Sequence, residues 1–156
     1  MAKIEAKHVA TGSAAAAIAL AGGLIYNFEG ERSRVYRDVV GIKTYCIGET
    51  RNPDPSKVYS HEECMSLLGG RLEEFNAAID KCVHVPLSTG QRGASLSFTY
   101  NLGAGAYCNG SVARNFNAGN PQAACDAMLL YNRAGGREIR GLTLRRQAER
   151  KVCLGG

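Results

Sequence analysis

The N-terminal fifth of the chain contains an uncharged stretch that runs directly into a glutamate. Val9 to Phe28 comprises 20 residues without Asp, Glu, Lys or Arg. As a helix it would be about 30 Å long, roughly the hydrocarbon thickness of a membrane. Alanine and glycine dominate it, so its burial removes little apolar area from water. The stretch is therefore marginal both as a membrane span and as a helix in water.

Four interpretations of this stretch compete. It is a cleaved signal peptide if Ala19-Leu20-Ala21 is a cleavage site. It is otherwise a permanent anchor, a weak anchor that inserts and later leaves the membrane, or the buried helix of a cytosolic protein. The lack of a linker before Glu29 favours the weak anchor, because permanent insertion would hold Glu29 at the bilayer surface, away from a folded domain. The six cysteines argue against a cytosolic protein.

Three residues after the stretch have the side chains that hydrolysis of a glycosidic bond requires. Glu29, Asp38 and Thr44 lie in FEGERSRVYRDVVGIKTYCIGET, separated by eight and then five residues. One carboxylic acid can protonate the leaving oxygen, while the second carboxylate activates a water or attacks directly. A hydroxyl beside the base can hold that water in line. Carboxylate pairs at this spacing are common on protein surfaces, so the spacing alone does not assign catalysis.

The surrounding residues resemble the catalytic segment of phage-type lysozymes, glycoside hydrolase family 24. The pattern is FEG-x6-YRD-x5-T followed by IGET, and the likeness continues in SLSFTYNLGAGAY (95–107) and GLTLRRQAER (141–150). The resemblance implies that Glu29 is the general acid and that Asp38 and Thr44 hold the attacking water. Such an inverting reaction needs carboxyl groups about 6.5–9.5 Å apart. One position departs from the family, because Glu49 stands where a histidine is usual, and this puts the support of the Asp38 loop in doubt.

The same resemblance implies the substrate and the fold. The substrate would be peptidoglycan, cut between N-acetylmuramic acid and N-acetylglucosamine for host cell lysis, with no metal or organic cofactor. The fold would be α+β and mainly helical, with a small β-hairpin lobe and a larger helical lobe joined by a long helix. Gly48 and Asn101 are candidate walls of a cleft between the lobes. Either Arg145 or Arg146 could hydrogen-bond Glu29.

The resemblance to endolysins with a signal-arrest-release segment also implies how the chain is organised. Residues 1–28 would be a membrane segment whose end forms the first helix on release, and residues 29–156 the lysozyme domain. We expect a monomer that associates transiently with the host inner membrane through residues 9–28, on its periplasmic face, and is then released to the periplasm.

Local patterns predict most of the secondary structure. β-forming residues broken by glycines after Glu29 predict a small hairpin. Capping boxes at Ser60 and Ser88 begin two predicted helices, and Asn120 is expected to cap another. The helices are expected at 61–81, 89–102, 111–119, 120–132 and 142–153.

Six cysteines suggest three disulfides and an oxidising compartment. Six allow 15 pairings, so the sequence alone does not choose among them. Chain order and placement suggest Cys46–Cys64, Cys82–Cys108 and Cys125–Cys153. There is no Cys-x2-Cys and no histidine pair at ligand spacing, which speaks against a zinc site.

The net charge of +5 is concentrated near the C-terminus. Between Arg133 and Lys151 lie seven basic and two acidic residues, and 7 − 2 = +5. This is either a solvated helix face or a source of attraction to an acidic polymer. Interleaved aromatics and nucleic-acid-binding motifs are missing, so we expect no nucleic acid partner; anionic cell wall or membrane fits better.

Two other functions remain open from the residues alone. A lytic transglycosylase uses one acid and no base, so Asp38 and Thr44 would be dispensable and the products would carry a 1,6-anhydro ring. A non-enzymatic protein could permeabilise membranes with the uncharged stretch and the basic C-terminal region. Analysis of the ends formed on purified peptidoglycan separates the three functions.

Overall fold

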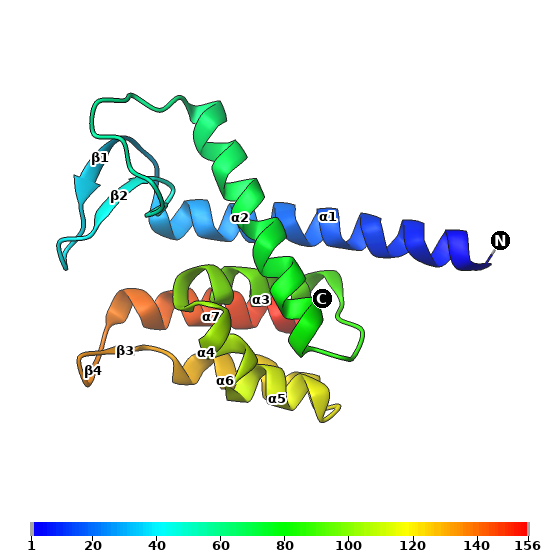
Figure 1. The fold of residues 1–156 in the computed structure, drawn as a ribbon. Helices are drawn as coiled ribbons and strands as arrows, with labels where there is room; N and C mark the ends of the chain where they lie inside the picture. Colours follow the sequence, from blue (N-terminus) through cyan, green and yellow to red (C-terminus); the bar gives the residue numbers. More distant parts are fainter. Residues whose placement is uncertain (1, 156) are drawn as a thin grey trace.

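The structure, a computed structural model, describes the backbone of residues 2–155 and the side chains of residues 14–155. It is mainly helical, with two small antiparallel hairpins (Figure 1). The helices are α1 (Ala2–Glu29), α2 (His61–Cys82), α3 (Thr89–Leu102), α4 (Ala104–Cys108), α5 (Ser111–Asn117), α6 (Pro121–Ala127), the 3-10 helix η1 (Met128–Leu130) and α7 (Arg140–Gly155). The strands are β1 (Arg32–Arg37), β2 (Lys43–Cys46), β3 (Arg133–Ala134) and β4 (Arg137–Glu138). The predicted mainly helical α+β class is confirmed.

The uncharged stretch lies within α1, so the first helix includes nearly all of residues 1–28 rather than only their end. Three of its small or apolar residues, Ala17, Ala21 and Ile25, recur every fourth position and are fully buried. They give α1 one buried stripe, and its main packing partner is α3. A Cβ on Gly93 of α3 would lie 2.9 Å from Leu20 Cδ2, so this glycine permits the close approach of the two helices. Nowhere in the described part of the chain is a helix both long and apolar enough to cross a membrane.

The first hairpin lies at one side of the molecule, and α2 runs from that side to the helical lobe, where it contacts α3 and α4 (Figure 1). Strands β1 and β2 pair antiparallel, with Tyr36 opposite Thr44. Helix α2 begins at the predicted capping box, in which the Ser60 hydroxyl accepts from the Glu63 backbone and the Glu63 side chain accepts from the Ser60 backbone. The helix then runs unbroken to Cys82, and the second predicted capping box, at Ser88, opens α3.

The helical lobe is built around α3, which packs against both α1 and α7. Its core includes Leu96, Phe98, Tyr107, Phe116 and Met128. Burial raises the pKa of Tyr107 to about 12, and its hydroxyl donates to Ser95 Oγ at 2.9 Å.

The segment from residue 120 to 140 differs from expectation. The predicted helix over 120–132 ends at Ala127, continues as a 3-10 turn, and has no side-chain cap from Asn120. A small hairpin then turns at Gly135 and Gly136, with φ of +58° and +78°. Two consecutive positive φ values are what a two-residue hairpin turn requires, so this glycine pair reverses the chain and α7 begins at Arg140.

The disulfides are the three pairs that were expected. Cys46–Cys64 joins the first hairpin to α2, with Cα atoms 4.9 Å apart. Cys82–Cys108 joins the end of α2 to α4 at 5.5 Å. Cys125–Cys153 joins α6 to α7 at 5.7 Å.

Candidate active site

Glu29 is the last residue of α1, and two structural features fix its position. Gly30, at φ +67°, ends the helix, and its N–H donates to the Tyr26 carbonyl at 3.0 Å. Such a left-handed residue is a common helix terminator. Arg145 of α7 approaches from the opposite lobe, with Nη1 2.6 Å from Glu29 Oε1. Of the two candidate arginines, the structure therefore selects Arg145 as the partner of Glu29.

The Glu29 carboxylate lines a pocket of about 250 Å³ between the lobes. Both predicted walls, Gly48 and Asn101, line the same pocket. The φ of Gly48 is +74°, which favours glycine, and a Cβ there would lie 3.2 Å from Glu29 Oε2, so that any other residue would press on the carboxyl group. Asn101 Oδ1 is buried and has no hydrogen-bond partner among the described residues. The remaining lining residues are Glu49, Thr50, Arg71, Phe75 and Tyr100.

Asp38 and Thr44 lie together on the first hairpin, outside that lining. Asp38 Oδ1 accepts from the backbone N–H of Val40 at 3.0 Å and of Ile42 at 2.8 Å, which closes the hairpin turn. The Thr44 hydroxyl is buried and donates to the Ile42 carbonyl at 3.0 Å. The structure thus ties both side chains to the same turn residue and orders the hairpin that carries them.

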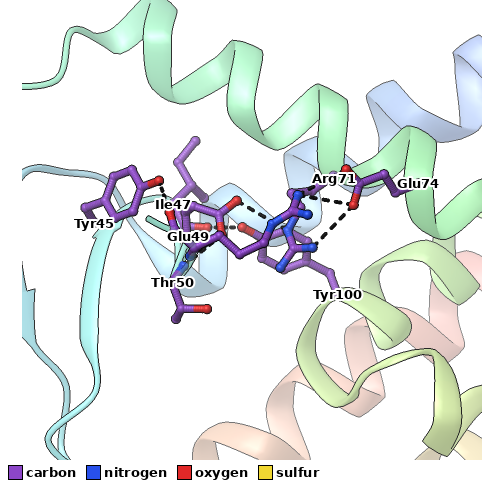
Figure 2. A network of polar contacts seen from close by, with 8 residues as sticks. Tyr45, Ile47, Glu49, Thr50, Arg71, Glu74 and Tyr100 are labelled. Carbon is purple, nitrogen blue, oxygen red and sulfur yellow. Dashed lines mark hydrogen bonds and ion pairs between the residues drawn. The ribbon is translucent and has the colours of Figure 1, made fainter. Parts of the chain in front are cut away.

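Glu49, the departure from the family pattern, has well-defined partners (Figure 2). Its side chain is only 4% exposed, and Oε1 accepts from the backbone N–H of Thr50 at 2.8 Å and of Arg51 at 2.9 Å. Oε2 lies 3.3 Å from Arg71 Nε. Arg51 and Arg71 also reach the exposed Glu74 carboxylate. An arginine on α2 therefore pairs with the glutamate, whose hydrogen bonds hold the turn of residues 49–51 rather than the Asp38 loop.

Tyr100 of α3 faces the same turn. Its hydroxyl donates to the Ile47 carbonyl. Its pKa is raised, first by burial and then by the negative charges of Glu49 and Glu29. Tyr100 therefore lies within the electrostatic reach of both carboxylates.

Three charged side chains of α7 are buried beneath the site. Arg145, Arg146 and Glu149 are each less than 5% exposed. Glu149 Oε2 lies 2.7 Å from Arg146 Nε, Glu149 Oε1 lies 3.4 Å from Arg145 Nε, and the Ser97 hydroxyl donates to Glu149 at 2.8 Å. Burial raises the pKa of the Glu149 carboxyl, and the two arginines oppose that shift. The C-terminal basic region is therefore not wholly a surface patch.

The sequence analysis gave no role to Arg71, Tyr100 or Glu149, although Tyr100 and Glu149 lie in the two later segments that resemble the family. Each is an ordinary helix residue until the fold brings it to the pocket or beneath it. Across the described residues, no group of three or more His, Cys, Asp or Glu side chains is placed to hold a metal ion.

The comparisons with known proteins agree on one family. The phage lysozyme family model matches residues 26–149. A SAR-endolysin of bacteriophage PS119 is 39% identical over 147 residues, covering 90% of this chain and 88% of that protein. The crystal structure of a P22 lysozyme mutant is 34% identical, with a TM-score of 0.76 over 86% of this chain and 94% of that one.

The endolysin Lyz of phage P1 gives two structural comparisons. Its active form has a TM-score of 0.79 at 23% identity, over 87% of this chain and 84% of that one. Its secreted inactive form has a TM-score of 0.58 at 18% identity, over 90% of this chain and 94% of that one. The fold described above is thus more similar to the first form. With a family model that spans most of its length and relatives of this similarity, the chain belongs to the phage lysozyme family.

Proposed function

We propose that this protein is an endolysin that hydrolyses the β-1,4 bond between N-acetylmuramic acid and N-acetylglucosamine in peptidoglycan, for host cell lysis. The observation that carries the proposal is the Glu29 carboxylate, which lies in the pocket between the lobes, 2.6 Å from Arg145, in a chain of the phage lysozyme family. The PS119 relative carries the name SAR-endolysin, which supports the lytic role.

In this proposal Glu29 donates the proton to the leaving oxygen. Asp38, held by two backbone N–H groups, acts as the base on the far face of the sugar, and the Thr44 hydroxyl helps to hold the attacking water. The reaction inverts the anomeric configuration. The unpaired Asn101 carbonyl oxygen supports a substrate-binding role, because a buried acceptor gains most when a ligand supplies its donor. Gly48 forms the adjoining wall.

The test is product analysis on purified peptidoglycan. The wild type should yield reducing ends without 1,6-anhydro rings, and Glu29→Gln should yield none while it remains folded, because it keeps the shape and removes the proton. Asp38→Asn should also be severely impaired. Anhydro products with an active Asp38→Asn variant would instead indicate a transglycosylase. Membrane leakage unaffected by Glu29→Gln would indicate a permeabilising protein.

We further propose that residues 1–28 are a membrane segment that is released to the periplasm and becomes the first helix of a monomeric enzyme, with residues 29–156 as the lysozyme domain. Residues 9–28 would insert in the host inner membrane before release. The packing of α1 supports this, because cleavage after Ala21 would remove Ala17 and Ala21 from the core of the folded enzyme.

Leucines in place of Gly22 and Gly23 test the release. The double variant adds apolar area worth about 2–4 kcal/mol to membrane insertion. In the folded state an open groove of about 500 Å³ between α1 and α2 borders both glycines, so the folded enzyme has room for the new side chains. The variant should stay in the membrane fraction and lyse poorly, whereas Gly22→Ser/Gly23→Ser should not. A lytic, soluble leucine variant, or mature protein beginning at Gly22, would replace release by cleavage.

A further inference from the structure

The turn that carries Gly48 is held by contacts from two helices. Within it, Tyr45 and Glu49 exchange two backbone hydrogen bonds of 2.9 Å. Cys46, at φ +53°, is tied to α2 by its disulfide with Cys64. Tyr100 of α3 binds the Ile47 carbonyl. The turn is therefore a small rigid unit whose place depends on α2 and α3.

This unit bears directly on Glu29. Gly48 lies against the Glu29 carboxyl so closely that a single added Cβ would be 3.2 Å from Oε2 and 3.3 Å from Cδ. On the other side, Arg145 holds Oε1 at 2.6 Å. The carboxyl group is thus confined between the turn and α7, and a shift of either would move it.

Glu49 is the charged member of the turn, and its carboxylate is fully engaged. Oε1 binds two backbone N–H groups of the turn itself, and Oε2 faces Arg71 (Figure 2). The side chain is only 4% exposed, so these contacts take up nearly all of its surface. A buried carboxylate is costly without such partners, so the pair with Arg71 offsets the burial of Glu49 and helps it to hold the turn.

We infer that Glu49 is a positioning residue for Glu29: paired with Arg71, its carboxylate fixes the turn of residues 45–51 and so holds Gly48 against the Glu29 carboxyl. The inference rests on the proposed function, in which Glu29 is the general acid. The charged or titratable groups around the Glu29 side of the pocket are Arg145 from α7, Arg71 from α2, Tyr100 from α3 and Glu49 from the turn.

Opposite changes of charge distinguish positioning from mere stability. Glu49→Gln removes a negative charge near Glu29 and leaves Arg71 with only the exposed Glu74 as an acidic partner, and both changes favour the ionised form of the Glu29 carboxyl. The alkaline limb of the pH–rate profile should therefore move to lower pH. Arg71→Gln removes the cation and leaves Glu49, so the limb should move to higher pH. A role in folding alone would leave both limbs in place, since only the amount of folded enzyme would change.

The rates should follow the geometry. Glu49→Gln should lower kcat on soluble glycan strands about tenfold with KM within about twofold, as expected when a reacting group is slightly misplaced. Arg71→Gln should lower kcat less, because Oε1 keeps its two backbone hydrogen bonds. Glu74→Gln is the matched control: Glu74 also pairs with Arg71, but it is 54% exposed and lies outside the pocket lining, so it should leave kcat and the profile unchanged.

The outcomes separate the two proposals. If Glu29→Gln is inactive while Glu49→Gln and Arg71→Gln keep wild-type kcat and unshifted profiles, the positioning role is wrong and the proposed function stands. If Glu29→Gln is active, the proposed function itself fails. Circular dichroism at the assay temperature gives the folded fraction, and if Glu49→Gln does not fold, the Arg71→Gln profile alone decides: a shift to higher pH supports positioning, and no shift overturns it.

Discussion

Glu29 is held from two sides, which differ in their distance from it along the sequence and in the contacts that hold them in place. On one side, α7 supplies a cluster of buried charges: Arg145, Arg146 and Glu149. Arg145, which contacts Glu29, lies 116 residues after it in the sequence. On the other, a short turn that lies much closer in the sequence supplies a glycine, a disulfide and backbone hydrogen bonds. The buried charges of the cluster depend on one another, whereas the turn is held by a disulfide and backbone hydrogen bonds as well. The comparison predicts graded effects.

The largest effect is expected in the buried cluster. Glu149→Ala leaves two buried arginines without their shared carboxylate, and the free energy of unfolding should fall by about 3–5 kcal/mol. Urea denaturation measures this loss. The control is Arg146→Met/Glu149→Leu, which removes the pair together and should cost clearly less. If Glu149→Ala were as stable as the wild type, the cluster would not be a stabilising unit.

The second largest effect is expected from the disulfides, whose removal tests stability and catalysis separately. Replacing both cysteines of Cys46–Cys64 or of Cys82–Cys108 by alanine opens loops of 18 and 26 residues, each worth about 3 kcal/mol. Only the first pair holds the turn against Glu29, so only its loss should also lower kcat at a temperature where both variants are folded. Equal activities in the two variants would contradict the role given to the turn.

Glycine at the turn gives a smaller and more local effect. Gly48 and Gly119 have similar φ values, +74° and +79°, so alanine should cost each about 1–2 kcal/mol. A Cβ at Gly119 meets nothing within 4 Å, whereas one at Gly48 meets Glu29. Gly48→Ala should therefore lose activity and Gly119→Ala should keep it, as measured by release of reducing ends from purified peptidoglycan.

The smallest effect is expected from an exposed acid on α2. A hydrogen bond from Lys57, and then one from the Ser60 backbone, lower the pKa of the Glu63 carboxyl. A carboxyl whose pKa is lower in the folded than in the unfolded protein stabilises the fold at a pH above its unfolded-state pKa. This stability is lost from about pH 5 downward, as the pH falls through the folded-state pKa. Glu63→Gln should slightly weaken the pH dependence of the unfolding free energy between about pH 5 and pH 3. An unchanged slope would show that the ion pair is fully screened.

Much of the fold and part of the site follow from local sequence. The capping box at Ser60 begins α2 because its hydrogen bonds join residues three apart, and the hairpin follows from β-forming residues between glycines. The glutamate, aspartate and threonine pattern, together with its flanking residues, is enough to indicate the family. The glycine pair at 135–136 is equally plain in the sequence, but only the backbone angles show that it turns a hairpin.

The sequence by itself determined most of the helices, the capped starts of α2 and α3, the cysteine content and the residues that resemble a lysozyme site, because these depend on neighbours within a few positions. The tertiary structure alone decided that α1 packs as a core helix against Gly93, that Arg145 rather than Arg146 meets Glu29, and that Arg71 neutralises Glu49. These are contacts between segments distant in sequence. Their free energies depend on burial and on the close approach of two surfaces, which no local pattern of residues records.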